Sequence, residues 1–295
     1  MGDELRARGV AVVTAGRPGH GAVDLALDLA DAANVSLVVA QARPSVVFHL
    51  AAQAFVPEAT ADPLATYDTN VMGTARLIEA LRALPREDRP RLLFASSGEV
   101  YGARAPAELP IRETLVPEPA TAYAASKVAA EAIVLGSARQ YGIDTVVTRA
   151  FNHIGPGQSE RFVVAAFAKR LAQIAAGSDP LFPVGNLSPA RDFLDVRDVV
   201  RAYADLAERG VAGQTYNVCS GVPTTIQEVL RQLVMAARVG VQIREDPTLV
   251  RPVDVPTVFG DSAKLRAATG WKPAYALPHS LRDVYAAARE ALGPS

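Results

Sequence analysis

Short apolar runs alternate with longer amphipathic stretches along most of the chain. The apolar and β-branched runs predict strands over residues 10–14, 46–50, 92–95, 145–149 and 215–219. Between them, apolar residues recur at steps of three and four, which predicts helices over residues 66–83, 126–141 and 197–209. Strands that alternate with helices predict an α/β fold with a mostly parallel, Rossmann-type sheet.

The pattern loosens after about residue 151. Turns containing glycine and proline surround a helix predicted over 162–175, and two more helices are predicted over 225–239 and 281–292. We therefore predict two parts. A main domain contains residues 1–151 together with about 191–220, where the pattern returns to the sheet. A smaller C-terminal lobe contains about 152–190 together with 221–295.

Composition narrows the class of protein. Of the 295 residues 49% are hydrophobic and 21% are charged, and the net charge is −1, so the chain has the balance of a soluble globular protein and no nucleic-acid footprint. The single cysteine, Cys219, suits a reducing, cytoplasmic location. The four histidines show no metal-ligand spacing, and no run of about 18 apolar residues predicts a membrane span. We expect neither a metal nor a membrane partner.

Candidate chemistry lies where predicted strands end, because ligands of parallel sheets bind beyond the carboxyl ends of the strands. Tyr123 and Lys127 are four residues apart, a spacing that puts both side chains on one face of a helix. A neighbouring ammonium favours the phenolate, which prepares a phenol for acid–base work. Ser97 follows a predicted strand and is placed to hydrogen-bond a substrate oxygen, the alternative being a turn residue that caps the strand.

Together these residues resemble the extended short-chain dehydrogenase/reductase (NAD-dependent epimerase/dehydratase) family. Ser97 stands four residues before Tyr101 of a V-Y-G segment, and the Tyr-x-x-x-Lys pattern falls on Tyr123 and Lys127. The segments HLAAQ and TGWKP, at 49–53 and 269–273, carry the resemblance further. It implies that Ser97, Tyr123 and Lys127 are catalytic and that the C-terminal lobe binds substrate.

The resemblance also implies binding residues. Those for the cofactor are Asp28, Leu29, Leu50, Ala51, Ala52, Gln53, Tyr123, Lys127, Phe151 and His153. Those for the substrate are Ser97, Asn152, Arg191, Arg251 and Asp254, with the two arginines as surface ion-pair partners in the alternative interpretation. Arg17 follows the first predicted strand, where an arginine pairs with the extra phosphate of NADP(H), although it is alternatively an exposed loop residue.

A narrower resemblance is to GDP-4-dehydro-6-deoxy-D-mannose reductases, through FNHIGPGQ (151–158), VGNL (184–187), TYNVCSG (215–221) and RPVDVPT (251–257). It implies reduction of the 4-keto group of a GDP-4-keto-6-deoxy-hexose by NADPH. Glu99 keeps a GDP-mannose 4,6-dehydratase open, since a glutamate there serves those relatives as a base. An NDP-sugar 4-epimerase is a further alternative. Family members form homodimers through the two helices that carry Asn70 and Lys127, which implies a homodimer here.

One expected family element is missing from these 295 residues. The family's first strand leads into T-G-x-x-G-x-x-G, whose glycines let the backbone approach a pyrophosphate at a helix N-terminus. The nearest stretch, TAGRPGHG at 14–21, differs in spacing by one residue. We therefore expect the first strand and its glycine turn to be absent from the chain. A non-catalytic relative with impaired cofactor binding is the alternative from another class.

Overall fold

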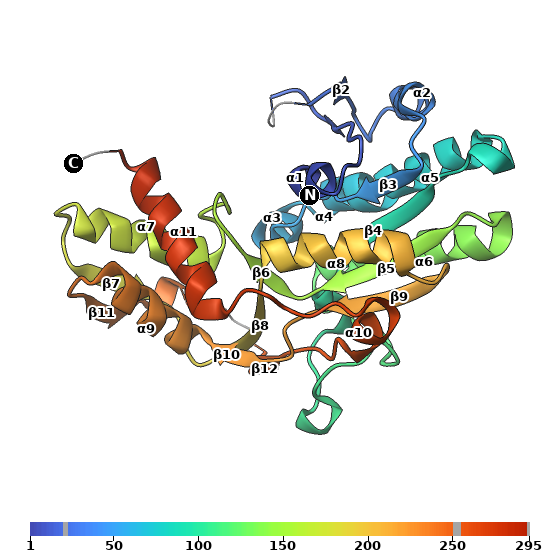
Figure 1. The fold of residues 1–295 in the computed structure, drawn as a ribbon. Coiled ribbons are helices and arrows are strands. Elements are labelled where there is room, and N and C mark those ends of the chain that lie inside the picture. The colour runs from blue at the N-terminus through green and yellow to red at the C-terminus, as the bar shows by residue number, and fades with distance from the viewer. Residues whose placement is uncertain (20–22, 250–254, 294–295) are drawn as a thin grey trace.

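The main sheet contains four parallel strands in the order β3-β4-β5-β9. They are β3 (Val46–His49), β4 (Arg91–Ser97), β5 (Thr145–Ala150) and β9 (Gln214–Val218). The structure is a computed structural model that describes residues 1–19, 23–249 and 255–293. Figure 1 shows the sheet in the larger part of the molecule and a separate lobe beside it. The predicted α/β class with a mostly parallel Rossmann-type sheet is confirmed.

Alternate residues of the central strands pack against helices on opposite faces of the sheet. Leu92 and Phe94 lie in one core cluster with residues of α2 (Ala32–Ala42), α5 (Gly73–Ala83) and α6 (Ala122–Tyr141). Leu93 points the other way and packs with residues of α8 (Val196–Arg209). This alternation is the two-residue period of a strand, and it gives three layers with the sheet in the middle.

The N-terminal segment departs from the predicted strand over 10–14. Helix α1 (Gly2–Ala7) is followed by extended chain, and the strand ladder starts only at β1 (Ala15–Gly16), which pairs in parallel with β2 (Leu25–Ala26). The prediction was wrong in position because an apolar run does not specify where a pairing partner lies. These two strands form a sheet of their own, and β3 is an edge strand of the main sheet.

The helix predicted over 66–83 forms in three segments. It starts as α4 (Pro63–Tyr67), widens into the π-helical turn η1 (Asp68–Met72) and continues as α5. Single π-helical turns are rare and often mark functional sites. The helix predicted over 126–141 starts earlier, at Ala122, because the hydroxyl of Thr121 accepts from the backbone N–H of Ala124 at 3.1 Å and caps it.

In the described residues, three helices and two small sheets form the lobe. Helix α10 (Ala263–Thr269), which the sequence analysis placed in the lobe, packs instead against α8 of the main domain. Helices α7 (Val163–Ala175), α9 (Ile226–Ala237) and α11 (Leu277–Ala291) bury one apolar cluster with Phe182 and Val184. Strand β7 (Leu181–Val184) pairs with β11 (Gln242–Glu245), and β8 (Ala190–Asp195) pairs with β6 (Asn152–Ile154), β10 (Pro223–Thr225) and β12 (Thr257–Val258). The return to the main sheet therefore begins with α8, not at residue 191 as expected from the sequence, because β8 pairs within the lobe.

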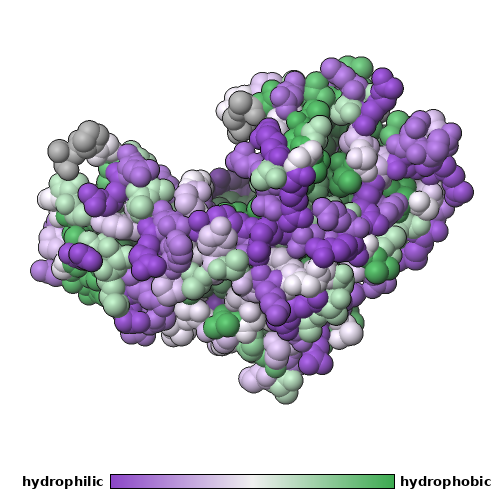
Figure 2. Space-filling view, in the orientation of Figure 1, coloured by the Kyte–Doolittle hydropathy of each residue, from purple (hydrophilic) through white to green (hydrophobic). Residues whose placement is uncertain are grey.

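Short helical segments complete the fold. They are α3 (Val56–Ala61), α10 (Ala263–Thr269), η2 (Arg86–Asp88), η3 (Gly98–Tyr101), η4 (Pro106–Glu108) and η5 (Pro247–Leu249). Across the described residues, each helix is too short or too polar to span a bilayer. Figure 2 shows a hollow between the lobe and the larger part of the molecule.

Candidate active site

Strand β4 and helix α6 bring the three predicted catalytic residues together. Ser97 is the last residue of β4, and Tyr123 and Lys127 occupy successive turns at the start of α6. Lys127 Nζ donates to the carbonyl oxygen of Ala95 at 2.7 Å, and the Ser97 hydroxyl is near enough to the Tyr123 phenol to lower its pKa. Lys127 also lies 5.0 Å from the centre of the Phe94 ring. The site has a phenol, a hydroxyl and an ammonium at the carboxyl end of the sheet.

Burial controls the acid–base properties of the pair. It raises the pKa of Tyr123 well above the ordinary value, the Glu99 carboxylate adds to the rise, and the hydrogen bond from Ser97 opposes it. Burial lowers the pKa of Lys127 to about 8, against the attraction of Glu131. At neutral pH Tyr123 therefore keeps its proton and Lys127 is mostly charged. Such a tyrosine is suited to donate a proton to an alkoxide.

Glu99 lies beside this site. Glu99 is exposed and belongs to η3, the helical turn that follows Ser97. Its backbone N–H donates to the Ser97 hydroxyl at 3.1 Å. Its carboxylate is close enough to Tyr123 to raise the pKa of the phenol. The structure therefore brings all four predicted catalytic residues together.

The loop after β3 is fixed by a buried polar network. Asn70, in the π-helical turn, accepts from Gln53 N at 2.8 Å and donates to Gln53 O at 2.9 Å and to Ser126 Oγ at 2.9 Å. Ser126 Oγ donates in turn to the carbonyl oxygen of Tyr123 at 2.7 Å. Asn70 thus ties the predicted cofactor loop to the helix of Tyr123. The sequence analysis gave Asn70 no role, although a polar residue on an apolar helix face was a usable signal.

His49 closes the same network. The Thr74 hydroxyl donates to Asn70 O at 2.7 Å, so its oxygen accepts the 2.9 Å hydrogen bond from His49 Nε2. Burial, helped by the charge of Lys127, lowers the pKa of His49 to about 3, and the ring is neutral. Leu50 and Ala51 follow it on the surface, whereas Ala52 and Gln53 are half-buried.

The residues predicted for the adenosine end of a cofactor share another edge. Arg17 directly follows β1, and Asp28 and Leu29 follow β2 in parallel register, so all three leave the small sheet at its carboxyl end. Arg17 and Asp28 are exposed. Leu29 rests against Gly73, where an added Cβ would lie 3.0 Å from the Leu29 Cβ, and its carbonyl accepts from Arg76 at 3.1 Å. These contacts attach the small sheet to α5.

The remaining predicted residues are more dispersed. Asn152 and His153 are exposed on β6, and Arg191 on β8 donates to the carbonyl oxygen of Val255 at 2.7 Å. The Phe151 ring is buried against Tyr101, so its side chain is part of the core and not of an open site. Arg251 and Asp254 lie outside the described residues.

The nicotinamide end of an NAD(P) cofactor fits the residues present. Gln53 Oε1 is buried and makes no hydrogen bond with the described residues, and Lys127 Nζ holds three protons of which Ala95 O takes one. For the pyrophosphate, the stretch 14–21 offers no substitute. The next described residues, from 23 on, lead into strand β2, whereas a phosphate-binding glycine turn leads into a helix.

Comparisons with known proteins agree with this geometry. A family model described as GDP-mannose 4,6 dehydratase matches residues 19–284. The chain is 43% identical over 242 residues to the GDP-6-deoxy-D-mannose reductase of Pseudomonas aeruginosa, covering 82% of this chain and 79% of that protein. The solved structure of RMD from P. aeruginosa complexed with NADPH is similar with a TM-score of 0.88 and 39% identity, over 98% of this chain and 95% of that one.

A second solved structure shows how wide the family is. The UDP-glucose 4-epimerase of Thermus thermophilus, in complex with NAD, has a TM-score of 0.87 and 30% identity, over 98% of this chain and 94% of that one. The chain belongs to the extended short-chain dehydrogenase/reductase family of NAD(P)-dependent epimerases and dehydratases. The predicted family is confirmed, and so is the predicted class of enzyme, an NAD(P)-dependent sugar-nucleotide oxidoreductase.

Proposed function

We propose that this protein reduces the 4-keto group of a GDP-4-keto-6-deoxy-hexose with NADPH. The observation that carries the proposal is the 43% identity to a GDP-6-deoxy-D-mannose reductase over 82% of the chain. At neutral pH Tyr123 holds its proton, and a protonated phenol can donate to the oxygen of a ketone during reduction.

Three side chains perform the proton chemistry. NADPH, when bound, supplies the hydride that reduces the carbonyl carbon. Tyr123 donates its proton to the oxygen that becomes an alkoxide, and Ser97 hydrogen-bonds the same oxygen. The Lys127 ammonium stabilises the phenolate that Tyr123 becomes, since a positive charge nearby favours the charged form of the phenol. Water then reprotonates Tyr123.

A product assay with two substrates tests the proposal. The purified chain should oxidise NADPH when given the 4-keto sugar nucleotide, and it should leave GDP-mannose unchanged. The GDP-mannose 4,6-dehydratase remains a second candidate because the Glu99 carboxylate lies close enough to Tyr123 to raise its pKa. Conversion of GDP-mannose to a keto sugar, abolished by Glu99→Gln, would establish the dehydratase. A reductase with Glu99→Gln should keep turnover of the same order.

The proposed cofactor is NADP(H), and Arg17 tests the preference. Arg17→Ala should weaken binding of NADPH more than that of NADH, because bidentate arginine contacts to the extra phosphate would be lost. Fluorescence titration measures both dissociation constants. Equal weakening of the two cofactors would remove Arg17 from the phosphate site. Lack of NADPH binding by the unaltered chain at millimolar concentration would favour a non-catalytic relative.

We further propose that the main domain and the lobe bind different ligands. Residues 1–151 with about 196–220 hold the cofactor, and about 152–195 with 221–295 hold the sugar nucleotide, with the boundary moved to the start of α8 because β8 pairs within the lobe. The exposed Asn152 and the half-buried Arg191 lie on the lobe sheet, and Arg251 and Asp254 belong to the same proposed set. Two arginines suit a nucleoside diphosphate, because each guanidinium group can bind two phosphate oxygens at once.

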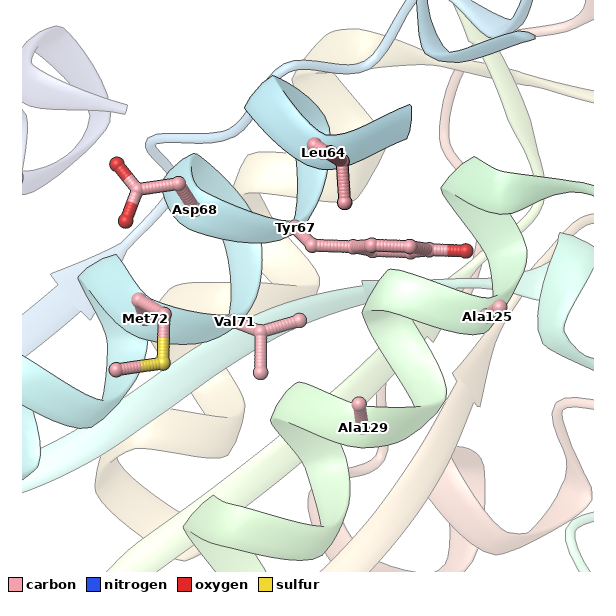
Figure 3. Close-up of a pocket in the computed structure, with 7 residues that line it drawn as sticks. All are labelled: Leu64, Tyr67, Asp68, Val71, Met72, Ala125 and Ala129. Carbon is pink, nitrogen blue, oxygen red and sulfur yellow. The ribbon is translucent and has the colours of Figure 1, made fainter. Parts of the chain in front are cut away.

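A homodimer is proposed on an apolar groove between α4–η1 and α6. Its volume is about 560 Å³, and Figure 3 shows side chains from the two segments facing one another across it. The lining residues are Leu64, Tyr67, Asp68, Val71, Met72, Ala125 and Ala129. Leu64 is 76% exposed and Met72 is 48% exposed. Small residues on α6 permit the close helix packing that the family resemblance implies.

Leu64→Glu should convert the proposed dimer to a monomer, because a carboxylate would then be buried without a partner in the interface. Size-exclusion chromatography with light scattering should report twice the 31.1 kDa chain mass for the unaltered protein and the single mass for the variant. The control is Leu37→Glu, a similarly exposed leucine (64%) on α2 outside the groove. A monomer in the unaltered protein would contradict the proposal.

A further inference from the structure

Three consecutive residues of β4 are held by three successive turns of α6. The Ser97 hydroxyl is near enough to Tyr123 to lower the pKa of the phenol, and Ala95 O accepts from Lys127. Between them, Ser96 Oγ donates to Glu131 Oε1 at 2.5 Å. Residues 123, 127 and 131 are four apart and share one face of the helix. The proposed catalytic groups supply two of these contacts, and Glu131 supplies the third.

Glu131 is fixed from the opposite side by a second strand. Arg149 of β5 donates through Nε to Glu131 Oε1 at 2.9 Å and through Nη2 to Oε2 at 2.6 Å. Both side chains are buried, at 7% and 4% exposure. A bidentate guanidinium–carboxylate pair has little freedom to rotate or slide.

Further contacts restrict the position of the Arg149 side chain. The Arg149 guanidinium lies 4.8 Å from the centre of the Tyr101 ring, and Tyr101 donates to Asn217 Oδ1 at 2.7 Å. Asn217 is fully buried in β9. The chain of contacts therefore joins α6 to three strands of the main sheet. Because a buried charge without a partner is costly, the sheet and the helix can satisfy Glu131 and Arg149 in only one register.

We propose that Glu131, anchored by Arg149, is a positioning residue that holds Tyr123 and Lys127 in register with Ser97 and Ala95. Its two carboxylate oxygens are occupied by Ser96 and Arg149. It acts through the helix backbone and through its carboxylate, which faces the Lys127 ammonium from the next turn. The functional consequence of this inference rests on the proposed reductase activity.

Several ionisable groups surround Lys127 and bear on the test. Tyr123 and Glu131 come from α6 itself, His49 faces it from β3, and Arg149 lies behind Glu131 on β5. His49 is neutral above about pH 3, and Tyr123 is protonated across the neutral range. Glu131 is therefore the charged neighbour that supports the Lys127 ammonium near neutral pH.

A titration that needs neither substrate nor cofactor tests the proposal. The chain contains four lysines, at 127, 169, 264 and 272, so lysine labelled with ¹³C at Cε gives four resolvable NMR signals. Lys127→Arg identifies the Lys127 signal. In the unaltered protein it should titrate near pH 8. In Glu131→Gln the midpoint should fall by about one pH unit, because the stabilising charge is removed.

Asp195→Asn is the matched control. Asp195 is also a buried carboxylate held by a serine and a bidentate arginine, since it accepts from Ser280 Oγ at 2.6 Å and from Arg197 at 2.8 and 2.7 Å. It lies in β8, in the lobe. This variant should lower the melting temperature, as Glu131→Gln does, and leave the Lys127 midpoint unchanged. If Glu131→Gln fails to fold, Glu131→Gln/Arg149→Met leaves no unpaired charge and should still lower the midpoint.

An unchanged Lys127 midpoint in the folded Glu131 variants would overturn the proposal and leave Glu131 a purely structural role. A kinetic measurement then follows. Displacement of the catalytic groups should lower kcat by up to about 100-fold with little change in KM, and the high-pH decline of kcat should move down with the Lys127 midpoint. If the unaltered protein reduces no keto sugar, the proposed function fails, and the NMR titration still decides the inference.

Discussion

Tyr123→Phe is expected to lower the rate of keto-sugar reduction by about 100- to 10,000-fold, the usual contribution of a positioned proton donor. The change removes one oxygen and leaves the ring in its buried place at the start of α6. Without the phenol, the alkoxide must take its proton from water. The effect should appear in kcat, and KM for the sugar nucleotide should change little, because the lost interaction strengthens only in the transition state.

Steady-state kinetics at pH 7 measure this loss, and NADPH titration shows whether the variant still binds cofactor. Tyr141→Phe is a matched control, since Tyr141 is at the opposite end of the same helix and contacts Arg82. It should retain full activity. A Tyr123→Phe variant that keeps the full reductase rate would show that another group donates the proton.

Asp192→Asn is expected to cost about 2–6 kcal/mol of folding free energy, counting about 1–3 kcal/mol for each of two buried donors left without an acceptor. Asp192 is fully buried in β8. Its Oδ1 accepts from Ser220 N at 2.8 Å and Ser220 Oγ at 2.6 Å, and its Oδ2 accepts from Gly221 N at 2.9 Å and Gly260 N at 3.3 Å. An amide nitrogen in place of Oδ2 would face two N–H groups.

Denaturant unfolding at neutral pH measures this cost. The carboxylate joins β8 of the lobe to the segment that follows β9 of the main sheet, so its loss should also loosen the lobe from the sheet. Glu208→Gln is the control, because Glu208 makes only an exposed ion pair with Arg8 at 3.5 Å. It should change the free energy of unfolding by less than about 0.5 kcal/mol. An equal effect of the two substitutions would contradict the role given to Asp192.

The misplaced strand and the misplaced domain boundary share one physical cause. Residues 10–14 have the apolar, extended pattern of a strand, but pattern alone does not name a partner. The ladder forms a few residues later, with β2, and the boundary expected near residue 191 moves because β8 pairs with β6, β10 and β12 in the lobe. Pairing depends on which edges the rest of the chain leaves open, and that is a property of the assembled fold.

The candidate site also contains residues that the sequence predicts and residues that it does not. Ser97, Tyr123, Lys127 and Glu99 could be found from spacing and resemblance, because local sequence places each one at the end of a strand or on one helix face. The sequence did not predict the roles of Glu131, Arg149 and Asn70, since each acts through a partner between 17 and 56 residues away. Glu131 stands four residues after Lys127 in the sequence. Its partner Arg149 is on strand β5, so the sequence does not show that the two side chains pair.

The sequence by itself determined the class of fold, the positions of most helices and the candidate trio of Ser97, Tyr123 and Lys127, because hydrophobic period and helix spacing are local properties. Only the tertiary structure decided how those residues behave. Burial raises the pKa of Tyr123 and lowers that of Lys127, and it makes Glu131, Arg149 and Asp192 depend on hydrogen-bond partners from other segments of the chain. Desolvation acts only once distant segments exclude water together, so these properties belong to the assembled chain.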